Sequence, residues 1–233
     1  MKHWDDRSRK QRARDLAALK RKGPTREPYD AVLIVCEGAK TEPQYFGEMR
    51  AKLRLASTNV VITGEGATDP IGIVNTAIAL FAADPIYDRV YCVFDRDTHA
   101  TYRPALEKIA ATRLRREGGK RGAGVARFAA ITSVPCFEYW LLLHYEYTTR
   151  PYERVGRHSA CDRLIHELKS HGHLPDYGKG AKGLYKETAP RLETAMNHAR
   201  RALAAAESGG TDNPTTRVHE LVEYLVALAA RRP

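Results

Sequence analysis

Residues 30–38 read Asp-Ala-Val-Leu-Ile-Val-Cys-Glu-Gly, and this stretch decides the fold. Residues 31–36 are all apolar and rich in β-branched side chains, a composition typical of a strand that is buried on both faces. Strands of this kind occur in parallel sheets that helices cover on both sides. We therefore predict an α/β fold whose first strand ends at Glu37.

Strand and helix patterns alternate after this segment. We expect strands at residues 59–63, 89–94 and 125–132, and helices at residues 41–55, 69–83, 102–117 and 137–144. Thr41 is a plausible N-cap of the first helix. The alternation predicts a mainly parallel, Rossmann-like sheet flanked by helices.

The pattern changes after Tyr147, where helical periodicity continues without good strands. Helices are expected at residues 159–170, 185–207 and 216–231, with Thr215 or Thr216 capping the last. We therefore divide the chain into a basic N-terminal arm (1–28), an α/β domain (29–147) and a helical C-terminal lobe (148–233).

The chain is strongly basic, since Lys and Arg exceed Asp and Glu by 38 − 28 = 10. Residues 1–28 alone carry ten basic residues against four acidic ones. Such an excess favours a polyanionic partner, nucleic acid above all, because each neutralised phosphate releases counterions. With 43% hydrophobic and 28% charged residues, the chain is globular rather than disordered.

The sequence also predicts where the protein works. No apolar run approaches the roughly 18 residues that span a bilayer, and the N-terminus is charged where a signal peptide is apolar. We expect a cytoplasmic protein without membrane contact. The four cysteines are widely spaced and form no C-x-x-C pair, so we expect them to stay reduced. They are Cys36, Cys92, Cys136 and Cys161.

Acidic residues follow two of the predicted strands. Glu37 ends the first strand, and Asp95-Arg-Asp97 ends the strand at residues 89–94. Residues i and i+2 of an extended segment point to one side, so Asp95 and Asp97 can face one cation. If the two strands are neighbours, the three carboxylates converge into a site suited to Mg²⁺ or Mn²⁺. Glu42 either supports this site or interacts with the dipole of its helix.

Three segments together resemble the RloB-like family. They are Ile34-Val-Cys-Glu-Gly-Ala-Lys-Thr-Glu-Pro-Gln-Tyr-Phe46, Pro135-Cys-Phe-Glu-Tyr-Trp-Leu-Leu-Leu-His144 and Asn213-Pro-Thr-Thr-Arg-Val-His219. The first segment, together with Asp95-x-Asp97, also resembles the Toprim domain of topoisomerases, primases and several nucleases. The sequence departs from the family at Val134, where Asn is common, and at Tyr139, where an aliphatic residue is common. Neither change touches the acidic residues.

The resemblance implies a fold, a chemistry and a setting. The fold is Toprim-like, Glu37 acts as general acid/base or metal ligand, and Asp95 and Asp97 hold the divalent ion. The implied role is bacterial defence against phage, as in abortive infection, by a nuclease associated with an AAA-type ATPase. Related Toprim nucleases cleave nucleic acid, in some cases tRNA.

Further residues are candidates for supporting roles. Glu138 is a possible metal ligand or outer partner, and His144 a possible proton shuttle, although both also suit a core helix with satisfied polar groups. Candidate nucleic-acid contacts lie in a glycine-rich loop at residues 177–185 and in a second basic stretch. They are Lys40, Lys179, Lys182, Arg115, Arg116, Lys120 and Arg121.

A zinc site is also conceivable among residues 158–173, which contain His158, Cys161, His166, His171 and His173. Their spacing matches no standard ligand pattern, so the sequence does not favour it.

These observations favour a metal-dependent nuclease and leave three alternatives. Asp95-Arg-Asp97-Thr98 resembles the nucleophile motif of haloacid-dehalogenase-like phosphatases, but His99 stands where Thr or Val is wanted and Glu37 would go unused. A non-catalytic nucleic-acid-binding subunit would explain the charge. The third alternative is a chain that shows no activity without its ATPase partner.

Overall fold

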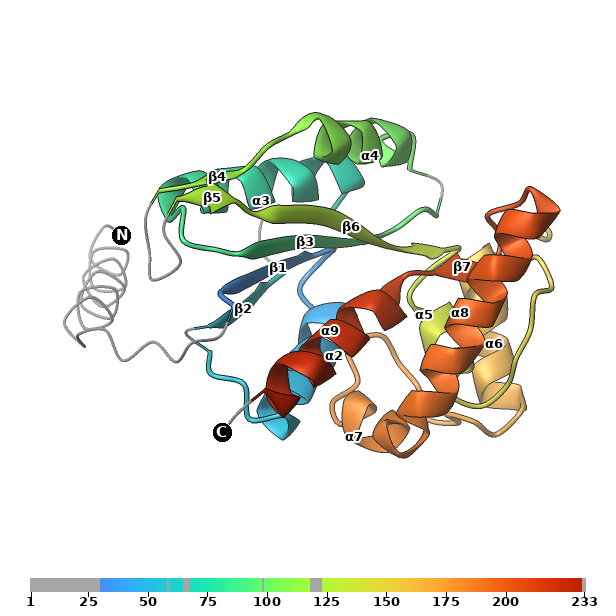
Figure 1. Cartoon of the computed structure of the whole chain (residues 1–233). Coiled ribbons are helices and arrows are strands. Elements are labelled where there is room, and N and C mark those ends of the chain that lie inside the picture. Colours follow the sequence, from blue (N-terminus) through green and yellow to red (C-terminus); the bar gives the residue numbers. More distant parts are fainter. Residues whose placement is uncertain (1–29, 58, 65–67, 98, 118–122, 232–233) are drawn as a thin grey trace, which may run out of the picture.

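The computed structural model describes residues 30–57, 59–64, 68–97, 99–117 and 123–231. The predicted basic arm lies outside these residues, and so do Lys120 and Arg121. Figure 1 shows three layers, with one twisted sheet between two groups of helices. The predicted α/β class with flanking helices is therefore confirmed.

The main sheet has the strand order β2-β1-β3-β6-β7. The strands are β1 (Val32–Cys36), β2 (Val60–Thr63), β3 (Arg89–Asp95), β6 (Arg127–Val134) and β7 (Thr215–Thr216). The first four in this order run parallel, and β7 pairs antiparallel with the end of β6. The predicted strands are confirmed within two residues at each end. The expectation of no strand after Tyr147 is wrong, because a two-residue strand such as β7 leaves no periodic pattern to detect.

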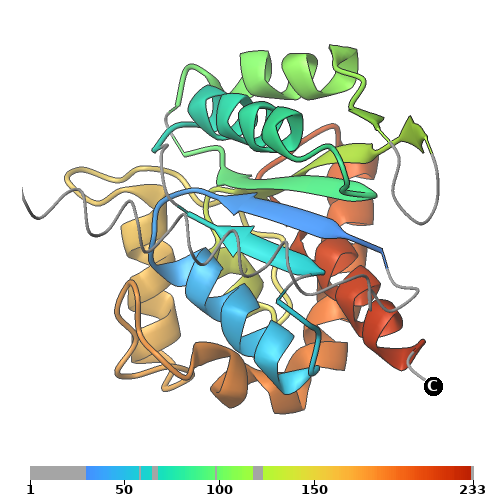
Figure 2. The same cartoon turned by 90° about the vertical axis from the view of Figure 1, so that its left-hand side faces the viewer.

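Successive residues of β1 pack into two different cores. Leu33 and Val35 face the helices α3 and α4, whereas Val32 and Ile34 face the opposite layer. The bounds of these two helices are Pro70–Ala83 for α3 and Tyr102–Ala111 for α4. Figure 2 shows helices on both sides of the sheet. This double burial explains why β1 is apolar at every position.

The remaining helices lie on the second side of the sheet (Figure 1). They are α2 (Thr41–Lys52), α5 (Glu138–Leu142), α6 (Ala160–Ser170), α7 (Leu184–Thr188), α8 (Leu192–Gly209) and α9 (Val218–Ala230). Their apolar residues form one cluster with this face of the sheet. The C-terminal helices therefore share a core with the α/β part of the chain. Within the described residues, no helix is both long and apolar enough to cross a membrane.

Two predicted helices differ from the structure. The helix expected over residues 102–117 ends at Ala111, because Thr112 takes an extended conformation. The chain then forms a small antiparallel hairpin of β4 (Arg115–Arg116) and β5 (Gly124–Val125). The helix expected over residues 185–207 is interrupted by a 3-10 turn that contains Pro190. Proline lacks the amide hydrogen that a continuous helix needs at that point.

The predicted helix caps are also wrong. Thr41 is the first residue of α2 rather than its cap, and the preceding Lys40 makes no side-chain cap hydrogen bond. Thr216 belongs to β7, and α9 begins two residues later. The hydroxyl of Thr216 still accepts a hydrogen bond from the amide of Val218 at 3.2 Å. Thr215 and Thr216 therefore pair with β6 as a strand instead of forming a standard helix cap.

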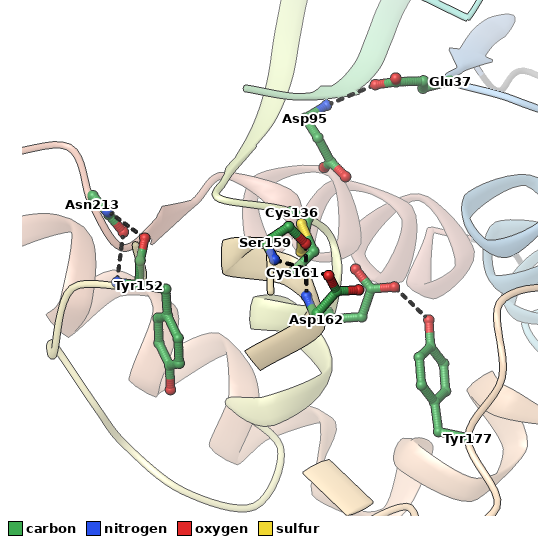
Figure 3. Close-up of a disulfide and its surroundings, with 10 residues drawn as sticks. Glu37, Asp95, Cys136, Tyr152, Ser159, Cys161, Asp162, Tyr177 and Asn213 are labelled. Atoms are coloured by element: carbon green, nitrogen blue, oxygen red, sulfur yellow. Dashed lines mark hydrogen bonds between the residues drawn. A yellow bond between two sulfur atoms is a disulfide. The ribbon is translucent and has the colours of Figure 1, made fainter. Parts of the chain in front are cut away.

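Two of the four cysteines are joined, contrary to the expectation that all stay reduced. A disulfide links Cys136, just after β6, with Cys161 at the start of α6 (Figure 3). Cys36 and Cys92 are free and buried. The bonded pair is 25 residues apart in the sequence, a separation at which no local pattern signals contact.

Candidate active site at the carboxyl ends of the strands

Glu37 and Asp95 meet at the edge of the sheet where the strand order reverses. β1 lies between β2 and β3. The next two strands along the chain are therefore added to opposite sides of β1. Ligands of open α/β sheets bind at such a point. The backbone amide of Asp95 donates a hydrogen bond to Oε2 of Glu37 at 3.1 Å (Figure 3). β1 and β3 are neighbours, which is the condition under which we expected these acids to meet.

Both carboxylate oxygens of Glu37 have partners. Oε1 lies 3.3 Å from Nε2 of His99, and Oε2 accepts the amide of Asp95. Burial raises the pKa of Glu37, and the charge of Asp97 adds to the rise, while Asp95 and His99 oppose it. His99 was not among the predicted site residues, although its place two residues after Asp97 is a signal that could have found it.

Asp97 lies beside Glu37, but not for the predicted reason. β3 ends at Asp95, and Asp97 sits in a turn with φ of 33°, a left-handed conformation that few residues other than glycine adopt. Its amide donates to the carbonyl of Pro135 at 3.1 Å, which ties the turn to the segment after β6. Asp95 and Asp97 therefore do not share one face of an extended strand. The charge of Asp97 nevertheless acts on Glu37, and the charge of Glu37 acts on Asp95.

Two more carboxylates join Glu37 and Asp95. Glu42, in the first turn of α2, and Glu138, the first residue of α5, are both buried. Glu138 accepts a hydrogen bond from the hydroxyl of Tyr177 at 2.8 Å. We call Glu37, Glu42, Asp95 and Glu138 the carboxylate cluster. The sequence indicated Glu138 as a candidate supporting residue, and it did not indicate its hydrogen-bond partner Tyr177.

The members of the carboxylate cluster act on one another. Burial raises the pKa of Asp95 well above its usual range, and the charges of Glu42, Glu138 and Glu37 raise it further. Burial likewise raises the pKa of Glu42 to about 8, with Glu138 and Glu37 adding to the rise. Crowded carboxylates of this kind hold protons or face a cation. Oxygen donors are the ligands that hard divalent ions such as Mg²⁺ or Mn²⁺ prefer, so the donor type of the cluster suits these ions. Among the described residues, however, its carboxylates do not together form a group whose ligand atoms all lie within 4.8 Å of one another.

Two glycines allow the turn after β1 to carry Glu37. Gly38 has φ of +61°, which a side chain would strain. Gly64, just after β2, lies against this turn so closely that a Cβ there would be 1.8 Å from the carbonyl oxygen of Gly38. The first strand and the second can therefore end side by side only with glycine at position 64.

The glycine-rich loop at residues 177–185 lies beside the carboxylate cluster. The amide of Gly180 donates to the hydroxyl of Thr41 at 3.2 Å. The charge of Lys179 lowers the pKa of Glu42 against the effect of burial. A Cβ on Gly180 would lie 3.2 Å from the side chain of Lys40. The loop thus brings Lys40 and Lys179 to the margin of the cluster, where both are exposed, as is Lys182.

Glu48 fixes the end of this loop. Its two carboxylate oxygens accept the amides of Gly183 at 2.5 Å and Tyr185 at 2.9 Å. No local sequence pattern indicates Glu48, because its partners lie about 135 residues away along the chain. The loop follows α6 rather than a strand, so its G-x-G-x-x-G spacing (Gly178, Gly180, Gly183) does not form a dinucleotide-binding turn.

Other predicted residues lie elsewhere. His144 is fully buried in the core, where Nδ1 contacts the carbonyl oxygen of Trp140 at 2.9 Å, and burial lowers its pKa to about 4. It makes no described contact with the carboxylate cluster. Arg115 and Arg116 lie in the hairpin at the amino-terminal end of β3 and β6, where Arg116 pairs with Asp88. The structure therefore does not bring these three residues together with the cluster.

One comparison with known proteins identifies a family. The model of the family described as RloB-like protein matches residues 32–225, which is most of the chain. No curated protein and no solved structure matches.

Proposed function

The chain belongs to the RloB-like family, and from this premise we propose that it is a divalent-metal-dependent nuclease of the Toprim type. The substrate class is RNA, with tRNA as one candidate, or DNA. The proposed setting is phage defence, in association with an AAA-type ATPase, as the family resemblance implies.

One observation carries the proposal. The carboxylate cluster gathers four acidic side chains from separate elements at the switch point of the sheet, in a chain whose net charge is +10. Without a cation, these carboxylates would repel a phosphate. A bound divalent ion reverses that sign and supplies Lewis-acid activation of water and of the scissile phosphate.

Each residue then has a part. Glu37, Asp95 and Asp97 hold the ion, while Glu42 and Glu138 set the charge around it. His99 Nε2, 3.3 Å from Glu37 Oε1, is placed to exchange a proton with that oxygen. Lys40 and Lys179 are exposed beside the cluster and supply positive charge for the flanking phosphates.

The test is a cleavage assay on total tRNA, single-stranded DNA and duplex DNA with Mg²⁺ or Mn²⁺. Wild type is compared with Glu37→Gln, and the matched control is Glu107→Gln, an exposed glutamate on α4. We expect cleavage by wild type and by the control, and its loss in Glu37→Gln.

Other outcomes separate the alternatives. Binding without cleavage, even with the neighbouring ATPase added, would indicate a non-catalytic nucleic-acid-binding subunit. Cleavage only with the ATPase would mean that the partner is obligatory. Release of inorganic phosphate from small esters without strand cleavage would favour the phosphatase.

A further inference from the structure

A second group of chemically capable side chains lies apart from the carboxylate cluster. Oε2 of Glu146 is 3.2 Å from Nδ1 of His171 and 3.3 Å from Nε2 of His173. The three donor atoms all lie within 4.8 Å of one another. One carboxylate oxygen therefore faces two imidazole nitrogens.

The backbone holds these three residues in place. Glu146 follows α5, and its amide donates to the carbonyl of Leu142 at 3.0 Å. His171 ends α6, and the amide of His173 returns to the carbonyl of Leu168 at 3.1 Å. Gly172, between the histidines, has φ of 72°, which allows this tight return. The group is thus built where the ends of two helices meet.

Ring packing orients His173. The ring of Tyr145 stacks on it with centroids 4.8 Å apart and planes inclined by 13°. His173 is partly buried, whereas His171 is more exposed. One ring is therefore fixed and the other open to solvent, which leaves a path for a small ligand.

Two of the three distances between the donor atoms match those of a metal site, and the third is within 4.8 Å. In a tetrahedral zinc site with bonds of about 2.0–2.1 Å, neighbouring donor atoms lie about 3.3 Å apart. The two distances from Glu146 Oε2 are 3.2 Å and 3.3 Å. Imidazole with carboxylate is a donor set that zinc accepts.

We propose that Glu146, His171 and His173 bind one Zn²⁺, with water completing the coordination. The ligands are Glu146 Oε2, His171 Nδ1 and His173 Nε2. The ion joins the end of α5 to the end of α6. This site differs from the histidine and cysteine set at residues 158–173, because Cys161 is bonded to Cys136 and Glu146 lies outside that range.

The test is calorimetric titration of the metal-stripped full chain with Zn²⁺ in excess Mg²⁺, which occupies oxygen-only sites. We expect one zinc per wild-type chain. His171→Ala with His173→Ala, and separately Glu146→Gln, should weaken binding by more than about tenfold, since even the outer partners of a ligand are worth that much.

Controls keep the result interpretable. His158→Ala with His166→Ala removes two exposed histidines outside the group and should leave zinc binding unchanged. Glu37→Gln with Asp95→Asn should do the same, which makes this test independent of the nuclease proposal. The single variant His171→Ala changes an exposed side chain and guards against loss of folding, which circular dichroism checks. Absence of zinc binding in wild type, or unchanged binding in the folded ligand variants, would overturn the proposal.

Discussion

The acidic residues at the two ends of the sheet have different kinds of neighbours. At the amino-terminal end, Asp30 is 3.3 Å from Arg89, and Asp88 pairs with Arg116 while accepting the amide of Ala31 at 2.8 Å. At the carboxyl-terminal end, the carboxylate cluster consists of acids that raise one another's pKa values. The acids at the amino-terminal end have arginine partners, whereas those of the cluster lie close enough to raise one another's pKa.

Asp95→Asn is expected to have the largest effect on this contrast. Loss of a carboxylate that we propose holds the ion should lower the cleavage rate by on the order of a thousandfold or more. Stability without metal should not fall, because a repelling charge is removed. Initial cleavage rates in Mg²⁺ and urea unfolding in chelator measure the two effects. Wild-type cleavage by this variant would remove Asp95 from the site.

The second test uses pH. The pKa of Glu42 in the folded protein is about 8, above its ordinary value of 4.5, so the folded state holds this proton more tightly. Its contribution to stability is present below pH 4.5 and is lost as pH rises toward 8. The free energy of unfolding without metal should fall over this range by on the order of a few kcal/mol. Urea unfolding at several pH values measures it.

Glu42→Gln is the control for this pH effect. The variant should show a flatter pH dependence, and added Mg²⁺ should flatten that of the wild type. An identical pH dependence for both proteins in chelator would mean that Glu42 titrates normally.

At the other end of the sheet, Asp88→Asn should reverse the pattern. It removes the charge that faces Arg116 and weakens the bond to Ala31, so we expect a loss of about 2 kcal/mol in the free energy of unfolding. Cleavage should be retained, because Asp88 lies away from the carboxylate cluster. Denaturant titration and the cleavage assay measure both. A folded Asp88→Asn protein without activity would contradict the separation of the two ends.

Tyr177→Phe should give the smallest effect. It removes the hydroxyl that donates to Glu138, at a cost of about 1 kcal/mol in stability. The Mg²⁺ concentration for half-maximal cleavage should rise by up to about tenfold, because Glu138 contributes to the charge around the proposed ion. Tyr147→Phe, a more exposed tyrosine that packs near His198, is the matched control. Equal Mg²⁺ dependence in both variants would separate Tyr177 from the site.

The sequence predicted the part of the site that follows from strand order. Glu37 and Asp95 each end a buried parallel strand, so their meeting required only that β1 and β3 be neighbours. Glu138 and Tyr177 come together from segments 39 residues apart, through packing that no local pattern records. The conformation of Asp97 likewise depends on a carbonyl of the segment after β6.

The pairing of Cys136 with Cys161 and the strand β7 escaped prediction for related reasons. Each depends on how the C-terminal helices return to the sheet, and a two-residue strand or a single disulfide has no periodicity to detect. The strands themselves were predictable because burial on both faces makes them apolar throughout.

The contact between Gly64 and the turn at Gly38 has a consequence for mutational scanning. If every position were randomised and variants selected for function, position 64 should tolerate substitution as poorly as the acidic positions, since a Cβ there would meet backbone at 1.8 Å. A selection that measures only function would therefore not distinguish this glycine from the proposed catalytic residues. Soluble yield separates them, because Asp95→Asn should accumulate as folded protein and Gly64→Ala should not.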